Sequence, residues 1–126
     1  MHSLQDDNSS RHFLVFMRAI AWSLAAAIIV LSIVPPRLRP ETVLPHGLEH
    51  FAIFCAMGVA FRLGYQRKPL RLIMLLVIFS AVVEIAQLSV PGRHARLADF
   101  VVDALAVCAG VVTPLLAKQV VTGAKS

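Results

Sequence analysis

Three residues that could do acid–base or metal chemistry, His46, Glu49 and His50, lie together in the stretch HGLEH. On a helix the two histidines, which are four residues apart, share one face and can ligate one zinc ion, while the glutamate can act as a general base. Inverzincin metallopeptidases use this HxxEH spacing. A catalytic zinc site takes three protein ligands, so this interpretation needs a further ligand from elsewhere in the chain.

Two further segments carry polar residues at helical spacing. Glu84 and Gln87 are three residues apart, and Asp99 and Asp103 are four apart, so each pair shares one face of a helix. One of these three carboxylates would have to be the third zinc ligand. Without a metal, the same residues suit a hydrogen-bonded cluster or a ligand site.

The composition places these residues in a membrane protein. The chain has 126 residues, of which 58% are hydrophobic, which is above the usual share in soluble domains. A transmembrane helix takes about 20 apolar residues, so four crossings leave only short loops. The net charge of +5 comes without a run of like charges or a nucleic-acid-binding motif, so nucleic acid is not an expected partner.

Small residues inside the apolar runs have simple roles. Cys55 and Cys108 are predicted to be packed thiols rather than a disulfide or metal ligands. Gly58, Ala106 and Gly110 are predicted to let neighbouring helices pack closely.

The chain is predicted to be all-α, with four transmembrane helices joined by short loops. The first apolar stretch could also be a secretory signal peptide, but it is long and ends in SIVPPRLRP without a small-residue cleavage site. Arg18, near its start, is expected to reach the lipid headgroups. The predicted spans are 13–34, 45–65, 72–90 and 97–116, which make up a membrane domain of 13–116, and the predicted tails are a flexible 1–12 and 117–126.

The basic residues predict the orientation of the spans. With four spans, both termini and the loop between the second and third spans lie on one side of the membrane. That side holds eight of the 12 basic residues, so the positive-inside rule predicts cytoplasmic termini. The eight are Arg11, Arg18, Arg62, Arg67, Lys68, Arg71, Lys118 and Lys125.

The polar positions of the spans then all lie toward the outer end of the bundle. From the rise of a helix, Glu84 and Asp103 lie about 9 Å, and His50 about 7.5 Å, inward from the outer ends of their spans. Charged residues in a span are costly unless they are paired or face water. Arg93 and Arg96, in the outer turn, are the available counter-charges. The cluster is therefore either a functional site or structural glue that holds the helices in register.

The segment from Leu44 to Gly110 resembles the VanZ-like family of small bacterial membrane proteins. The resemblance rests on His50 with the phenylalanines that follow it, and on the stretch EIAQLSVPGRHARLADFVVDALAVCAG. Within that stretch the family pattern is a Glu and a Gln on one helix, a proline-glycine-arginine turn, and an Asp that opens the next helix. The matching residues are Glu84, Gln87, Pro91, Gly92, Arg93 and Asp99.

The chain departs from the family pattern at two places. His46 and Gly47 stand where the family usually has Asp and Lys, and Asp103 and Ala106 stand where it usually has Asn and Gly. The first change removes a positive charge from the polar cluster and the second adds a negative one. Because the family has Asp at the position of His46, we predict that the protein binds no metal and no other cofactor.

The resemblance implies a multi-pass protein of the bacterial inner (cytoplasmic) membrane that influences the cell envelope. The family's namesake is associated with low-level resistance to teicoplanin, a glycopeptide that acts outside that membrane. We therefore predict an outward-facing polar pocket whose partners are membrane lipids and an anionic or lipid-linked envelope molecule. The residues predicted to form its ligand site are His46, Glu49, His50, Glu84, Gln87, Arg93, Arg96, Asp99 and Asp103.

Two other classes of function stay open on the sequence. A membrane hydrolase or transferase acting on a lipid-linked envelope substrate would use a general base while the two arginines of the outer turn bind a phosphate. The catalytic candidates are His50, Glu84 and Asp99. A purely structural or partner-binding membrane subunit would need none of this chemistry.

Overall fold

The structure, a computed structural model, describes residues 2–38, 45–91 and 96–123. Over these residues the chain is all-helical, as predicted. Its elements are α1 (His2–Ile33), the short 3-10 helix η1 (Pro36–Leu38), α2 (His46–Gly64), α3 (Pro69–Gln87) and α4 (Leu97–Gly123). Each of the 4 α-helices is long and apolar enough to cross a membrane, which agrees with the predicted number of spans.

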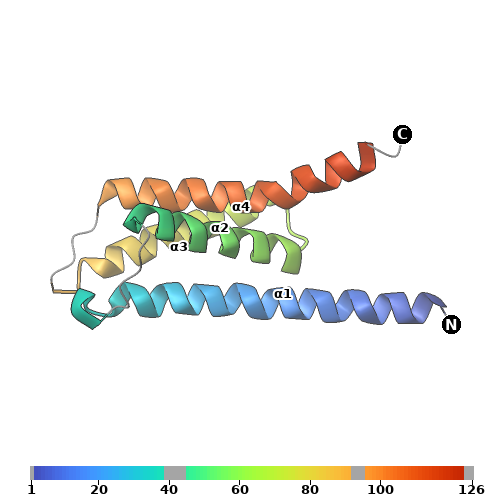
Figure 1. The fold of residues 1–126 in the computed structure, drawn as a ribbon, viewed down its shortest axis with the longest axis horizontal. Helices are drawn as coiled ribbons and strands as arrows, with labels where there is room; N and C mark the ends of the chain where they lie inside the picture. The colour runs from blue at the N-terminus through green and yellow to red at the C-terminus, as the bar shows by residue number, and fades with distance from the viewer. Residues whose placement is uncertain (1, 39–44, 92–95, 124–126) are drawn as a thin grey trace.

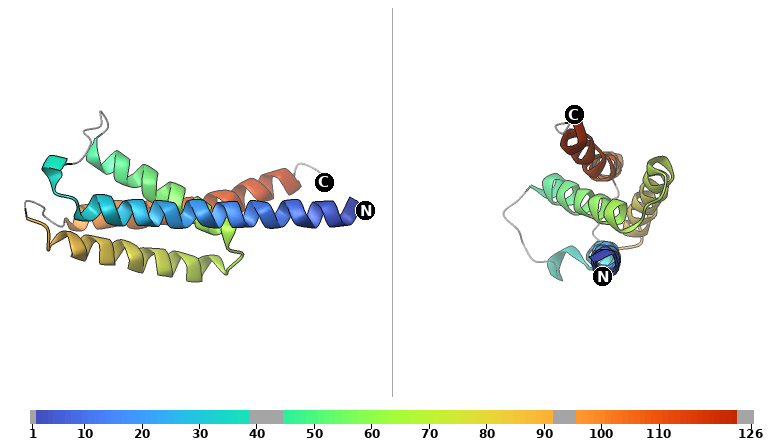
Figure 2. Two further views of the ribbon diagram at one scale, coloured as in Figure 1. Left: turned by 90° about the horizontal axis from the view of Figure 1, so that it is seen from below. Right: turned by 90° about the vertical axis from the view of Figure 1, so that its right-hand side faces the viewer.

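The four helices run roughly along one axis, and successive helices are antiparallel (Figure 1). Helix α1 begins and α4 ends at one end of the bundle, beside the connection from α2 to α3; we call this the termini end. At the opposite end, which we call the polar end, α1 and α3 finish and α2 and α4 begin. Seen along its axis, the bundle has α2 between α1 and α4 (Figure 2). Which side of the membrane each end faces stays a prediction.

The first and last helices, α1 and α4, extend beyond the predicted spans. The segment 1–12, predicted to be a flexible tail, is helical from His2, and α4 continues to Gly123 instead of ending at residue 116. A helix satisfies its own backbone hydrogen bonds, so it can continue from lipid into the headgroups and water. An ion pair one turn apart, between Asp7 and Arg11 at 3.4 Å, lies on the surface of this extension.

The bounds of α3 are also shifted from the predicted 72–90. The helix begins at Pro69, because proline suits the first turn, where its missing N–H is not needed. It ends at Gln87, and the next backbone bonds are of the tighter turn type, such as Val90 N–H to the Gln87 carbonyl at 3.1 Å.

Helices α2 and α4 pack closely because small residues face each other where they meet. A Cβ atom on Gly110 would collide with the carbonyl oxygen of Cys55, and one on Gly58 would lie 2.9 Å from the carbonyl oxygen of Val107. Ala106, one turn before Gly110, is fully buried. The predicted packing role of the small residues is therefore confirmed. This contact fixes the position of the first turns of α2 relative to those of α4.

The outer surface of the bundle is apolar. Large side chains such as Phe16, Leu75 and Leu105 are at least 60% exposed. In water a continuous surface of this kind would drive association, whereas in a bilayer it contacts lipid. The buried core is correspondingly small, with Phe54 and Met57 of α2 among its largest members.

Aromatic and basic side chains join α1 to α2 near the termini end. The indole N–H of Trp22 donates a hydrogen bond to the Tyr65 hydroxyl at 2.8 Å. The guanidinium group of Arg18 donates to the Gly64 carbonyl at 2.8 Å and lies 4.8 Å from the centre of the Tyr65 ring. Arg18 therefore links two helices rather than simply extending to the headgroups. Trp and Tyr at this level are typical membrane-interface anchors.

Candidate functional site

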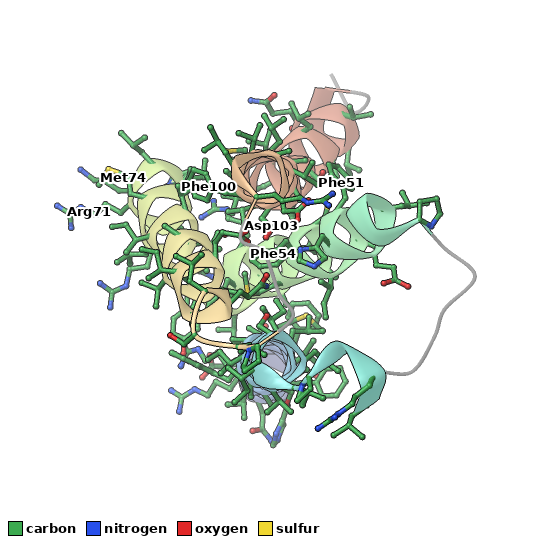
Figure 3. The ribbon with its side chains drawn as sticks, turned by 90° about the vertical axis from the view of Figure 1, so that its left-hand side faces the viewer. Phe51, Phe54, Arg71, Met74, Phe100 and Asp103 are labelled. Atoms are coloured by element: carbon green, nitrogen blue, oxygen red, sulfur yellow. The ribbon has the colours of Figure 1, made fainter. Side chains whose placement is uncertain are left out.

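The centre of the polar cluster is a buried pair between α2 and α4. His50 lies in the second turn of α2 and is 7% exposed, while Asp103 in the second turn of α4 is fully buried. The Nδ1 atom of His50 lies 3.1 Å from Oδ1 and 3.3 Å from Oδ2 of Asp103. Figure 3 shows Asp103 pointing from α4 into the bundle beside Phe54, whose ring stacks on the imidazole with 6.1 Å between centroids. The pair is held by packing as well as by polar contact.

The pairing fixes the orientation of the imidazole ring. Opposite an ionised Asp103, which can only accept hydrogen bonds, His50 would donate through its Nδ1–H. In the neutral ring Nε2 is then the basic nitrogen. A carboxylate that orients a histidine in this way is the arrangement used by acid–base catalysts and by metal ligands alike. The departure from the family pattern at Asp103 thus supplies the partner of His50.

Glu84 joins α3 to the start of α4. Its side chain is 7% exposed, and Oε1 accepts a hydrogen bond from the backbone N–H of Arg96 at 2.6 Å. The carbonyl of Arg96 accepts the first backbone bond of α4, from Asp99 N–H at 2.9 Å, so Arg96 stands at the N-cap of the helix. Negative charge is favoured at a helix N-terminus. Arg96 was predicted to act through its side-chain charge, but its contact with Glu84 comes from the backbone, and its side chain is exposed.

The second oxygen of Glu84 makes no hydrogen bond to the part of the chain that the structure describes. Oε2 is buried and has no hydrogen-bond partner among the residues that the structure describes. A buried carboxylate oxygen usually has a partner, because leaving one unpaired is costly. Oε2 therefore marks a place where a donor from a ligand or a cation would fit.

Helix α1 reaches the cluster through a serine that the sequence analysis did not select. The Nε2 of Gln87 donates to the Oγ of Ser32 at 3.4 Å, and both side chains are buried. The available signal was a serine in the last turn of α1, after a run of apolar residues. By contrast Ser80, buried one turn before Glu84, donates to the Leu76 carbonyl of its own helix at 3.0 Å and makes no hydrogen bond to a second element among the described residues.

The charged members of the cluster interact with one another. Asp99, Asp103 and His50 are all close enough to act electrostatically on the Glu84 carboxylate. Asp99 lies half-buried in the first turn of α4, where an acid also interacts favourably with the helix dipole. Three carboxylates and one histidine from three helices therefore share one electrostatic environment at the polar end. Like charges in a medium of low dielectric repel strongly, so the group would attract a cation.

The remaining predicted site residues are not joined to this cluster by described contacts. Glu49 is half-buried, and its Oε1 has no hydrogen-bond partner among the described residues. The side chain of His46, at the start of α2, and the whole of Arg93 lie outside the part of the chain that the structure describes. Among the side chains that it does describe, no three of His, Cys, Asp or Glu gather closely enough to hold a metal ion. The absence of zinc stays a prediction.

Comparison with known proteins gives one match. The family model described as VanZ/LLP1 matches residues 3–118, which include all of the four-helix bundle except His2 and the last residues of α4. No curated protein and no solved structure matches the chain. The predicted resemblance is thus confirmed, and it extends well beyond the segment on which it rested. Since the match covers more than half of the sequence, the chain is a multi-pass membrane protein that belongs to the VanZ/LLP1 family.

Proposed function

We propose that this protein binds an anionic or lipid-linked molecule of the cell envelope at the polar end of its bundle, and that it alters tolerance of teicoplanin-type glycopeptides through this binding. The observation that carries the proposal is the convergence of His50, Asp103 and Glu84 from three helices, with one carboxylate oxygen of Glu84 buried and without a hydrogen-bond partner among the described residues. The family match supports the envelope setting.

A ligand site explains this cluster better than structural glue does. Holding helices together needs only paired polar groups, and neutral pairs do this at a lower desolvation cost than ionised pairs. The cluster instead buries two carboxylates, Glu84 and Asp103, with the half-buried Asp99 near them. Removing ionisable groups from water is costly enough that intramembrane acids usually serve substrate binding or proton transfer.

The proposal requires the polar end to face outward. The distribution of basic residues favours this orientation, since most of them lie at the termini end or in its loop. Reporter fusions at Ser126 and in the PPRLRP segment test it: a reporter that is active only in the periplasm should be silent at Ser126 and active in the segment. The reverse pattern would place the cluster on the cytoplasmic side and remove its connection to drugs that act outside.

The decisive variant for the site is Glu84→Gln, which keeps the shape of the side chain and removes its charge. Expression of the wild-type protein in a teicoplanin-sensitive bacterial host should raise the inhibitory concentration of the drug, and Glu84→Gln should abolish the increase while the protein still accumulates in folded form. Ser80→Ala is the matched control, because Ser80 is buried on the same helix but bonds only to its own backbone. Full tolerance with Glu84→Gln would show that the carboxylate is not needed and would leave the structural interpretation.

A second candidate function is a membrane hydrolase or transferase that acts on a lipid-linked envelope substrate. The observation in its favour is the orientation of His50 by Asp103, which prepares Nε2 to act as a general base. Purified protein in nanodiscs, given an isoprenoid diphosphate, would then release phosphate at a rate that falls with both His50→Gln and Asp103→Asn. Binding of the same lipid without any release would favour the binding function over the enzyme.

A further inference from the structure

Helix α4 bends in its last third, close to Pro114 (Figure 1). Proline inside a helix lacks the N–H that would bond to the carbonyl four residues earlier, and its ring crowds that carbonyl, which here belongs to Gly110. The bend turns the end of α4 away from α1 and α2. Between these three helices, at the termini end, lies an open cleft of about 830 Å³ whose lining includes Pro114 and Leu115.

Cations form the rim of this cleft. Arg62, Arg67, Lys68 and Lys118 all line it, and no acidic side chain of the described residues does. The guanidinium group of Arg62 donates to the Arg67 carbonyl at 2.7 Å, which holds the connection after α2 against the end of that helix. The side chains of Arg67, Lys68 and Lys118 are exposed, and the ion pairs of the described residues do not involve them. Positive charge from two helices and a loop is therefore concentrated here, and no acidic side chain of the described residues lies in the lining to balance it.

Apolar side chains form a further part of the lining, which we call its floor, and Ser9, Ser10 and Gln66 also line the cleft. Phe13 and Leu14 of α1, Leu63 of α2 and Leu115 of α4 contribute to it. A free inorganic anion would gain nothing from these side chains, whereas an amphiphile would place its charged group on the rim and its hydrocarbon on the floor. Candidate spans begin or end near this level, so in a bilayer the cleft would stand where phospholipid headgroups meet their acyl chains.

We propose that this cleft holds one anionic phospholipid of the leaflet on the termini side. Its phosphate contacts the ammonium group of Lys118 and the guanidinium group of Arg67, and the upper part of an acyl chain lies against Phe13 and Leu115. The site is about as far from the polar cluster as the bundle allows, and it does not depend on the function proposed for that cluster. It differs from general attraction to a charged surface because the apolar floor and the bend of α4 give it a defined shape.

The experiment measures phospholipid retained by purified protein. The protein is placed in detergent with phosphatidylglycerol or phosphatidylcholine, and bound lipid is counted by native mass spectrometry. We expect about one phosphatidylglycerol per chain, no stable phosphatidylcholine, and roughly fivefold weaker retention with either Lys118→Gln or Arg67→Gln, the change expected for one cation near an anionic lipid. Both side chains are exposed, so the variants should fold normally.

Two variants test whether lipid retention depends on the cleft or only on the positive charge at this end of the bundle. Arg71→Gln removes the same charge at the same end, from a side chain that points away from the bundle on α3 (Figure 3), and should retain lipid like the wild type. Pro114→Ala keeps every charge but allows α4 to straighten, and should weaken retention. Equal losses with Arg71→Gln and Lys118→Gln, or no loss with Pro114→Ala, would overturn the proposal. Complete displacement of the lipid by millimolar inorganic phosphate would overturn it as well, since the occupant would then be a soluble anion.

Discussion

The two ends of the bundle use charged residues in opposite ways. At the polar end the acids Glu84 and Asp103 are buried between helices and make contacts with other elements. At the termini end Arg67 and Lys118 are exposed around an open cleft and make no ion pair among the described residues. Because the acids of the polar end are buried, losing one of their polar contacts should lower the stability of the fold. The exposed cations of the termini end can be substituted with little effect on stability.

The two ends of the bundle are connected through its middle. The close contact of α2 with α4 near Gly58 and Gly110 lies between them and fixes how the first turns of both helices meet. If that contact opened, His50 would move away from Asp103 while the exposed cations would be little disturbed. The four predictions that follow test this contrast in order of the effect expected.

The largest effect is expected from Gly110→Leu. A Cβ at this position collides with the Cys55 carbonyl and lies 3.1 Å from the Cα of Gly58, so the two backbones must separate. We expect a loss of about 3 kcal/mol or more in the free energy of unfolding, seen as little or no folded protein in detergent. The control is Gly47→Ala on α2, the helix that Gly110 contacts, because a Cβ at Gly47 would meet nothing within 4 Å. Normal yield and thermal stability with Gly110→Leu would mean that the helices do not pack in this way.

The second prediction compares one residue from each end. Asp103→Ala removes the acceptor that lies 3.1 Å from Nδ1 of His50, and should lower the free energy of unfolding by about 1–3 kcal/mol. Asp103→Asn, which restores the residue usual in the family, keeps an acceptor oxygen and should lose less. Lys118→Ala, at the termini end, should change stability hardly at all, because its side chain is exposed. Denaturation in detergent measures all three, and a loss for Lys118→Ala equal to that for Asp103→Ala would remove the contrast between the ends.

The sequence was sufficient to predict the number of helices, their alternation and the gathering of polar residues at one end. Each of these follows from the length of apolar runs and the helical rise, which a membrane constrains strongly. The backbone contact of Arg96 with Glu84 could not be predicted, because every residue has an N–H group and nothing in the side chain marks the one that is used. The role of Ser32 was missed for a related reason, since a serine in a span most often bonds to its own helix, as Ser80 does.

The helix ends were predicted less well than the helices. Composition shows where a chain leaves lipid, but a helix can continue into water because its backbone bonds are internal. Polar residues at the start of α1 and at the end of α4 therefore looked like tails although they are helical. The cleft at the termini end depends on this extension, since Ser9 and Lys118, which line it, both lie outside the predicted spans.

A smaller effect is expected at the aromatic anchors near the termini end. Tyr65→Phe removes the hydroxyl that accepts the Trp22 hydrogen bond at 2.8 Å, but it keeps the ring that stacks on Phe61. The bond is exposed, so its loss should cost only about 0.5–1 kcal/mol in the free energy of unfolding. Trp22→Phe should cost a similar amount, and the double variant should cost less than the two together, because both remove the same bond. Strict additivity would show that the bond contributes nothing.

The smallest effect, none at all, is expected from removing metal ions. The pairing of His50 with Asp103 would suit a zinc ligand, since carboxylates commonly orient such histidines, so the geometry of this pair alone does not decide the question posed by HGLEH. The number of ligands bears on it more directly: a third donor is needed, and among the described side chains no three of His, Cys, Asp or Glu gather closely enough to hold a metal ion. We therefore expect elemental analysis of purified protein to find far less than one zinc per chain, and EDTA to leave its melting temperature unchanged. About one zinc per chain, lost in both His46→Ala and His50→Ala, would contradict this and would supply the polar end with the positive charge that its carboxylates favour.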